Sequence, residues 1–406
     1  MTGKQAIIEF FVKNNIHDLF YLPGIHTLSL SQAFSGENIN VYITRHESNM
    51  VFMADGFSRV SGKIGVLIVT PGPGLANVVT GCMEAYGDDV PLLVIHIDTG
   101  REGIDKGILH GVAEPETMVR HVTKEVFYVQ STDDLIIKLD SARKVAMTDR
   151  KGPVLISIPY TLLEKEVETI RSSEENPVQM QHIDDFDGLE KVLAGKKKPV
   201  IIGGKALMFE KARPLLDNIC LHFSIPFLTT TSGKGILDEE NVWCFGNIMQ
   251  KGIAKKIVSS ADIIIAIGTR LRDVDAKRRG VKISDLIHVD VDRAWFDKNY
   301  SAVYRASGKI LPFLHALNEI FTSSSFNWRL KELKEAQHLE RLGLQNKFLG
   351  FQLINVIKNS IPDDTTTVWD LNLMAYWAEY YYPVRHQHTF IMPRGISSIF
   401  YALPAA

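Results

Sequence analysis

The stretch "IGVLIVTPGPGLAN", residues 64–77, decides the fold expected for this chain. Its first half is a short apolar run, and its second half is a glycine- and proline-rich turn that leads into an apolar helical pattern. Apolar runs of four to eight residues separated by helices are typical of parallel strands that are covered on both faces. The stretch therefore predicts an α/β domain built on a parallel sheet.

The same alternation continues on both sides of this stretch. Further strands are expected at "DLFYLPG", "NVYIT", "PLLVIHID" and "GPVLISIP", the last of which ends near Tyr160. A second set, "KPVIIGG", "PFLTTT", "ADIIIAIG" and "DLIHVDVD", indicates a second α/β unit, and a third unit begins around Leu349. The predicted fold class is α/β, with three doubly wound parallel-sheet domains of which the third is incomplete.

Two polar connectors set the expected domain boundaries. We expect a first domain over residues 1–163, a strand-poor linker over 164–185 and a central domain over 186–321. A charged, largely helical connector covers 322–348, and the third domain covers 349–406. Its last stretch, "SSIFYALPAA", has the pattern of the first turns of an apolar helix that needs further partners, so we expect this domain to be truncated.

The composition fits a globular protein and argues against several classes of function. The 406 residues carry a net charge of −2, so electrostatic binding to nucleic acid or to an anionic membrane is not expected. Three cysteines without a CxxC pair argue against a disulfide framework and a structural zinc site. The N-terminus has a helical pattern and no signal-peptide pattern, and no apolar run is long enough to span a bilayer. We expect a cytoplasmic protein.

Polar residues and glycines gather where the expected strands of the first domain end. Ligands of open parallel sheets bind at the carboxyl ends of the strands. Each feature also has a structural alternative, because an acid can favour the positive end of a helix dipole and glycines form ordinary turns. Their co-occurrence at four strand ends favours a site. The residues are Gly24, Ile25, His26, Glu47, Gly72, Gly74, Asn77 and His110.

The order of the motifs resembles the thiamine-diphosphate-dependent enzymes, a family that includes acetolactate synthase, pyruvate decarboxylase and benzaldehyde lyase. The stretches "FYLPG", "RHESNMVFMADGFSRVSG", "GVLIVTPGPGLAN" and "GPVLISIP" resemble the pyrimidine-binding domain. The stretches "TTTSGKGILDE", "SADIIIAIGTRL" and "LIHVDVD" resemble the family's central domain. The stretch "TTTVWDLNLMAYWAEYYY" resembles the start of its diphosphate-binding domain. The layout is most similar to acetolactate synthase large subunits, with features of benzaldehyde lyase.

This resemblance implies a catalytic role for Glu47. In the family, the matching glutamate hydrogen-bonds N1′ of the cofactor's aminopyrimidine, and it thereby helps the 4′-amino group to take the proton from C2 of the thiazolium. Burial beside Met50 and Val51 would favour a shared proton, because desolvation disfavours a charged carboxylate.

Other cofactor-binding positions follow from the same resemblance. Gly24 and Ile25 match the turn that faces the thiazolium, where the apolar Ile25 cannot transfer protons. Gly72 and Asn77 match the loop beside the pyrimidine. Ile399 matches a bulky aliphatic residue that supports the bent cofactor, and a plain core role is its alternative.

His26 and His110 are expected to act as acid–base or hydrogen-bonding groups, because an imidazole titrates near working pH. The tripeptide "GIH" resembles the "GAH" of benzaldehyde lyase, in which the histidine faces the substrate. His110 falls where acetolactate synthases carry an aromatic residue beside a glutamine. A structural role is the alternative for each histidine.

The resemblance also implies Mg²⁺ and makes FAD a further candidate cofactor. Acetolactate synthases bind FAD in the central domain, and Gly203, Gly204, Gly268 and Arg270 stand at strand ends where a dinucleotide would bind; ordinary turns are the alternative. The family holds Mg²⁺ and the diphosphate through a GDG motif followed by an asparagine. No GDG motif occurs in this chain, so no metal-binding residue is assigned, and Mg²⁺ is expected to bind through residues beyond Ala406.

The resemblance implies a 2-oxoacid decarboxylase or carboligase, a transferase or lyase similar to the acetolactate synthase of branched-chain amino-acid biosynthesis. Its substrate would be pyruvate or a similar 2-oxoacid. One alternative is a benzaldehyde lyase-like enzyme that cleaves a 2-hydroxyketone, and another is a catalytically silent nucleotide-binding or regulatory homologue. Because the family's active site lies between subunits, a homodimer or homotetramer is expected, and the 406 residues alone are expected to be inactive.

Overall fold

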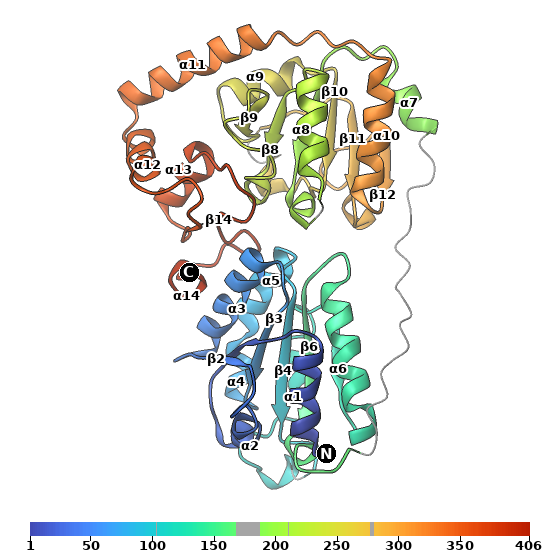
Figure 1. Cartoon of the computed structure of the whole chain (residues 1–406), viewed down its shortest axis with the longest axis vertical. Coiled ribbons are helices and arrows are strands. Elements are labelled where there is room, and N and C mark those ends of the chain that lie inside the picture. Colours follow the sequence, from blue (N-terminus) through green and yellow to red (C-terminus); the bar gives the residue numbers. More distant parts are fainter. Residues whose placement is uncertain (103, 168–186, 210, 277–279) are drawn as a thin grey trace. The chain divides into compact units, whose positions relative to one another are not determined.

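The protein consists of two compact units, each built around a six-stranded sheet (Figure 1). The first unit contains Met1–Val178 and Pro393–Ala406, and the second contains Gln179–Met392. All paired strands are parallel, and the second unit also contains a two-stranded sheet, so the predicted α/β class is confirmed. Most of the predicted linker, residues 168–185, lies outside the described residues. The computed structural model describes residues 1–102, 104–167, 187–209, 211–276 and 280–406.

The sheet of the first unit has the strand order β2-β1-β3-β4-β6-β5. Every neighbouring pair is parallel, so the carboxyl ends of all six strands lie at one edge. Every residue of β3, β4 and β6 is buried, which explains their unbroken apolar sequences. The strands are β1 (Asp18–Tyr21), β2 (Asn40–Ile43), β3 (Gly65–Val69), β4 (Leu92–Asp98), β5 (Val126–Tyr128) and β6 (Pro153–Pro159).

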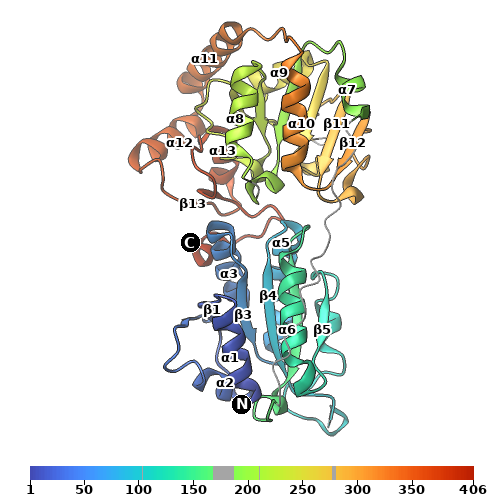
Figure 2. The same cartoon turned by 45° about the vertical axis from the view of Figure 1, so that its right-hand side comes forward.

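Helices cover both faces of this sheet. The core under α1 and α6 contains Leu19, whereas the next residue, Phe20, packs into the core under α3 and α5. Figures 1 and 2 show these two pairs of helices on opposite sides of the strands. The helices are α1 (Gly3–Lys13), α2 (Leu28–Gln32), α3 (Glu47–Ser61), α4 (Pro73–Asn77), α5 (Val79–Gly87) and α6 (Thr132–Met147).

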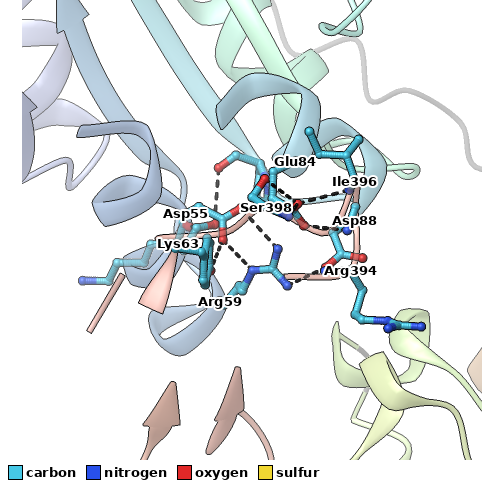
Figure 3. Close-up of polar contacts among 12 residues, drawn as sticks. Asp55, Arg59, Lys63, Glu84, Asp88, Arg394, Ile396 and Ser398 are labelled. Carbon is cyan, nitrogen blue, oxygen red and sulfur yellow. Dashed lines mark hydrogen bonds and ion pairs between the residues drawn. The ribbon is translucent and has the colours of Figure 1, made fainter. Parts of the chain in front are cut away.

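The last residues of the chain pack on α3 and α5 (Figure 3). The fully buried Glu84 accepts hydrogen bonds from the backbone N–H groups of Gly395 (2.5 Å), Ile396 (3.1 Å) and Ser398 (3.1 Å), and from the hydroxyl of Ser398 (2.9 Å). Arg59 bridges two further carboxylates, Asp55 and Asp88. Asp55 also accepts a hydrogen bond from the hydroxyl of Tyr401, and Asp88 accepts one from the backbone N–H of Arg394. Buried acceptors therefore hold this segment on the first unit.

The helix expected to begin in "SSIFYALPAA" is shorter than predicted. Only α14 (Ala402–Ala405) is helical, because Ser397 and Phe400 have positive φ angles of 66° and 60°. Such angles break a right-handed helix.

The second unit has the sheet order β12-β11-β10-β7-β8-β9. Helices α8 and α10 pack side by side on one face (Figure 1), and α11 to α13 follow with the small β13–β14 sheet. Among the described residues, no helix has the length and apolar character needed to cross a membrane. The strands are β7 (Pro199–Gly203), β8 (Phe227–Thr229), β9 (Cys244–Asn247), β10 (Ile263–Ile267), β11 (Leu286–Asp290), β12 (Tyr304–Ser307), β13 (Thr367–Val368) and β14 (Phe390–Ile391). The helices are α7 (Asp187–Leu193), α8 (Arg213–His222), α9 (Ile253–Ser260), α10 (Ile310–Thr322), α11 (Leu330–Lys347), α12 (Leu349–Ser360) and α13 (Leu373–Tyr381).

Candidate active site

The candidate site lies at the carboxyl edge of the first sheet. β1 runs into the turn that carries His26, and β2 runs into Glu47 at the start of α3. β3 is followed by the glycine turn before α4, and β4 by the loop that carries His110. Parallel pairing brings these four strand ends to one edge, as the sequence predicts.

Glu47 is the first residue of α3, and its side chain is only 8% exposed. The side-chain amide of Asn77 donates to Glu47 Oε2 at 2.9 Å, and the hydroxyl of Ser48 donates to the backbone oxygen of Asn77 at 2.7 Å. Within the described part of the chain, no hydrogen bond to Oε1 is found. The carboxylate is thus fixed through one oxygen, while the other can accept a ligand.

The glycines of the site allow close packing around Thr70, a residue that the sequence interpretation missed. A Cβ atom on Gly74 would lie 2.5 Å from Thr70 Oγ1 and 3.6 Å from Glu47 Oε1, and one on Gly24 would lie 2.4 Å from Thr70 Cγ2. Thr70 follows directly after β3, so its position at the strand end was the signal that could have identified it. These contacts bring the ends of β1, β2 and β3 together.

Gly72 brings the His110 loop against the same turn. Its φ angle is +61°, and a Cβ atom there would lie 3.0 Å from the backbone oxygen of His110. His110 itself has a positive φ of 64°, an uncommon angle for a residue with a side chain. The backbone is therefore constrained on both sides of this contact.

The two predicted histidines lie next to each other. The ring centroids of His26 and His110 are 5.7 Å apart with the rings nearly perpendicular, and Tyr160, directly after β6, contacts His26 in the same way at 5.7 Å. Burial, and then the charge of His110, lower the pKa of His26. His26 therefore stays neutral to a lower pH than an ordinary histidine. Tyr160 was not predicted, although it too follows a strand end.

Two predicted cofactor contacts are exposed. Ile25 is 75% exposed in the turn before His26, and Ile399 is 60% exposed in the segment held by Glu84. Their expected contacts with a cofactor stay predictions.

The residues proposed for FAD meet at one end of the second sheet. Gly203 is the last residue of β7. A Cβ atom on Gly204 would lie 2.3 Å from the backbone oxygen of Gly268, and a Cβ atom on Gly268 would lie 3.0 Å from the backbone nitrogen of Leu207. The guanidinium of Arg270 lies 5.3 Å from the centre of the Trp295 ring. Close packing alone accounts for Gly204 and Gly268, so their role in binding FAD stays a prediction.

The described residues can accommodate the aminopyrimidine end of thiamine diphosphate. A buried carboxylate with one fixed and one available oxygen suits the N1′ nitrogen of an aminopyrimidine. No group of three or more His, Cys, Asp or Glu side chains that could hold a metal ion is found among the described residues.

Comparisons with known proteins point to one family. Residues 1–122 match the family described as "Thiamine pyrophosphate enzyme, N-terminal TPP binding domain". Residues 187–317 match the one described as "Thiamine pyrophosphate enzyme, central domain". The first matched segment contains β1 to β4 of the first sheet, and the second contains β7 to β12, the whole of the second sheet.

Several curated proteins are similar along the whole chain. A probable 2-ketoarginine decarboxylase of Pseudomonas aeruginosa is 29% identical over 417 residues, which cover 100% of this chain and 74% of that protein. The acetolactate synthase large subunit of Lactococcus lactis is 27% identical over 431 residues, with 100% and 73% covered. A probable acetolactate synthase large subunit of Methanocaldococcus jannaschii is 25% identical over 432 residues, again with 100% and 73% covered.

Proposed function

Because this chain belongs to the thiamine pyrophosphate enzyme family, we propose that it is a 2-oxoacid decarboxylase or carboligase. The protein is an enzyme of the group that contains acetolactate synthases and decarboxylases. Its similar proteins carry the names of enzymes, which argues against a catalytically silent homologue. The observation that carries the proposal is the buried Glu47, fixed by Asn77 at the edge where both histidines lie.

In this proposal, Glu47 holds or shares a proton at N1′ of the aminopyrimidine through its available Oε1. Thiamine diphosphate supplies, when bound, a carbon nucleophile and an electron sink for cleaving the bond next to a carbonyl. Asn77 keeps the carboxylate in one orientation, so that reaching the productive geometry costs little reorganisation. With only 8% of its surface exposed, Glu47 is also shielded from most of the bulk water.

His26 and His110 are proposed to contact the substrate. A neutral His26 can donate one hydrogen bond to a substrate oxygen or accept a proton, and its lowered pKa keeps it neutral at working pH. His110, at the surface of the same edge, can orient a carboxylate or hydroxyl group of the substrate. This histidine pair also favours the second candidate function, a benzaldehyde lyase-like cleavage of a 2-hydroxyketone.

The choice among substrates stays open between the two kinds of similar protein. Decarboxylation of a 2-oxoacid with a cationic side chain is supported by the similarity to a probable 2-ketoarginine decarboxylase. Carboligation of pyruvate, as in branched-chain amino-acid biosynthesis, is supported by the similarity to acetolactate synthases. Both reactions begin with the same loss of CO₂ from a 2-oxoacid.

Four further features are proposed on the family resemblance alone. They are Mg²⁺ as the partner of the diphosphate, FAD in the central domain, assembly into a homodimer or homotetramer, and a cytoplasmic location. A flavin absorption spectrum of the purified protein tests FAD, and light scattering tests the oligomer.

Turnover of a substrate panel tests the proposed function. The product of the complete coding sequence is used, because the 406 residues alone are expected to be inactive. It is incubated with thiamine diphosphate, Mg²⁺ and, separately, pyruvate, 2-oxobutyrate, 2-oxo-5-guanidinopentanoate or benzoin, and released CO₂ and the organic products are measured. CO₂ from at least one 2-oxoacid supports the proposal. Cleavage of benzoin without CO₂ from any 2-oxoacid would replace it by the lyase function.

A further inference from the structure

The loop between β4 and the 3₁₀ turn at Pro115–Met118 carries His110, and it is closed at its base by one side chain. Arg101 Nη1 donates to the backbone oxygen of Ala113 at 2.7 Å. Arg101 Nη2 lies 2.7 Å from both carboxylate oxygens of Glu116. One guanidinium thus joins the start of the loop to its end.

The acceptor of this clamp is held in a fixed place. Glu116 is only 5% exposed, and it follows the buried Pro115 at the start of the 3₁₀ turn. The guanidinium of Arg101 lies 4.5 Å from the centre of the Tyr128 ring, on β5. A planar guanidinium that stacks on a ring and contacts a carboxylate is well suited to fix a geometry, since little of its freedom remains to be lost.

The tip of the same loop touches the candidate site in two places. The backbone of His110 lies against Gly72, where a Cβ atom would approach its oxygen to 3.0 Å. The ring of His110 meets the ring of His26 at 5.7 Å. Because His110 has a positive φ angle and an exposed side chain, these local contacts do not fix its position unaided.

We propose that Arg101 is the positioning residue for His110: its contacts with Ala113 and Glu116 hold the loop so that His110 meets His26. This inference rests on the proposed function, in which the two histidines contact the substrate. Arg101 itself lies at the loop base and acts through the loop. Loss of the clamp frees the loop ends, and the His110 ring then moves away from His26.

The test follows the titration of His26 by NMR in the full chain labelled with ¹⁵N and ¹³C at histidine. Assignment comes from His26→Gln and His110→Gln variants. In the wild type, His26 titrates below the ordinary value because of burial and the charge of His110. In Arg101→Gln, the pKa of His26 is expected to rise toward its ordinary value, in the same direction as in His110→Gln.

A matched variant separates this effect from the loss of any ion pair. Arg143→Gln removes the ion pair on α6 of the same unit in which Arg143 Nη2 lies 2.9 Å from Asp140 Oδ1. This variant is expected to leave the titration of His26 unchanged. Arg101→Lys keeps the charge but cannot bridge Ala113 and Glu116 with one planar group. If Arg101→Gln does not fold, Arg101→Lys serves as the test. It is expected to raise the pKa of His26 toward the ordinary value, as in Arg101→Gln.

The proposal is overturned if His26 titrates in the folded Arg101 variant as it does in the wild type, or if Arg143→Gln shifts it equally. The readout needs neither cofactor nor turnover. If the wild type releases no CO₂ from any 2-oxoacid while Arg101→Gln still shifts His26, the clamp stands and the proposed function falls.

Discussion

Asn77, the last residue of α4, donates its side-chain amide to Oε2 of Glu47, the first residue of α3, at 2.9 Å. The two residues are 30 positions apart and come from the turns after β3 and β2. This hydrogen bond fixes Oε2 and leaves Oε1 without a hydrogen bond among the described residues. It therefore links the glycine-rich turn to the chemistry proposed for Glu47.

Replacing Asn77 with alanine should lower both turnover and stability. A hydrogen bond to a charged group contributes about 1.5–3 kcal/mol to the free energy of unfolding, and an equal loss in the transition state would slow decarboxylation roughly 10- to 100-fold. Ser48→Ala is the control, because it removes the hydrogen bond to the Asn77 backbone and leaves the Glu47 contact in place. Equal kcat values for the wild type and Asn77→Ala would show that the orientation of Glu47 does not limit the reaction.

An alanine at Gly72 should both destabilise the protein and displace His110. The left-handed φ costs a residue with a side chain about 1–2 kcal/mol, and the new Cβ would press on the His110 backbone. Gly62→Ala is matched to it, because Gly62 has a φ of +70° with nothing within 4 Å of the added Cβ. Urea unfolding should show a loss of stability in both variants. The loss should be larger in Gly72→Ala, because its φ and ψ of 61° and −109° lie outside the left-handed region that Gly62 occupies and because its Cβ meets His110. Only Gly72→Ala should change the His26 titration, and a change in both would contradict the contact.

Glu84→Gln should loosen the end of the chain. An amide presents an N–H₂ group where Glu84 now accepts from three backbone N–H groups, and each buried group left unpaired costs about 1–3 kcal/mol. Hydrogen exchange at residues 395–398 should become faster, and the free energy of unfolding should fall. The exposed Glu9 offers a control, since Glu9→Gln should leave both quantities unchanged. Unchanged exchange in Glu84→Gln would argue against the anchor shown in Figure 3.

His96 should make the stability depend on pH. It is fully buried on β4, with Nδ1 2.9 Å from the hydroxyl of Ser157, and burial lowers its pKa to about 4. In the unfolded chain, His96 has its ordinary pKa near 6.5, so the unfolded chain binds more protons than the folded one between pH 6.5 and 4. The contribution of the neutral, buried His96 to stability is therefore fully present above pH 6.5 and is lost as the pH falls toward 4. The loss should reach about 3 kcal/mol.

Urea unfolding at a series of pH values checks this dependence. His96→Gln should flatten the curve between pH 6.5 and 4, whereas the exposed His121 should be replaceable without changing its slope. Parallel curves for the wild type and His96→Gln would show that His96 is not the group responsible.

Much of the first sheet could be predicted from the sequence, because β3, β4 and β6 are short, mostly apolar and fully buried; β5, with only three residues, was missed. Parallel pairing then follows from the helices between them, and parallel pairing alone brings Glu47 and His26 to one edge. The buried start of α3 at Glu47 is the point where sequence and structure agree most closely.

Contacts between distant residues could not be predicted in the same way. Thr70 and Tyr160 carry no motif, and their roles depend on which strand ends become neighbours. The clamp from Arg101 to Glu116 joins charged residues that look like ordinary surface side chains in the sequence. The helix predicted in "SSIFYALPAA" begins only at Ala402, since the positive φ angles at Ser397 and Phe400 arise where the segment packs on α3 and α5.

The central claim is that Glu47 activates thiamine diphosphate, and proton exchange at C2 of the cofactor measures this most directly. The exchange of the C2 proton with D₂O is followed by NMR after rapid quenching, in the presence of Mg²⁺. It is measured for the free cofactor and for the cofactor with the wild-type product of the complete coding sequence or its Glu47→Gln variant. Acid–base assistance by a placed side chain contributes roughly 10²- to 10⁴-fold. The account predicts faster exchange with the wild type than in free solution and a loss of at least about 100-fold in Glu47→Gln. Equal exchange rates for Glu47→Gln and the wild type would contradict it.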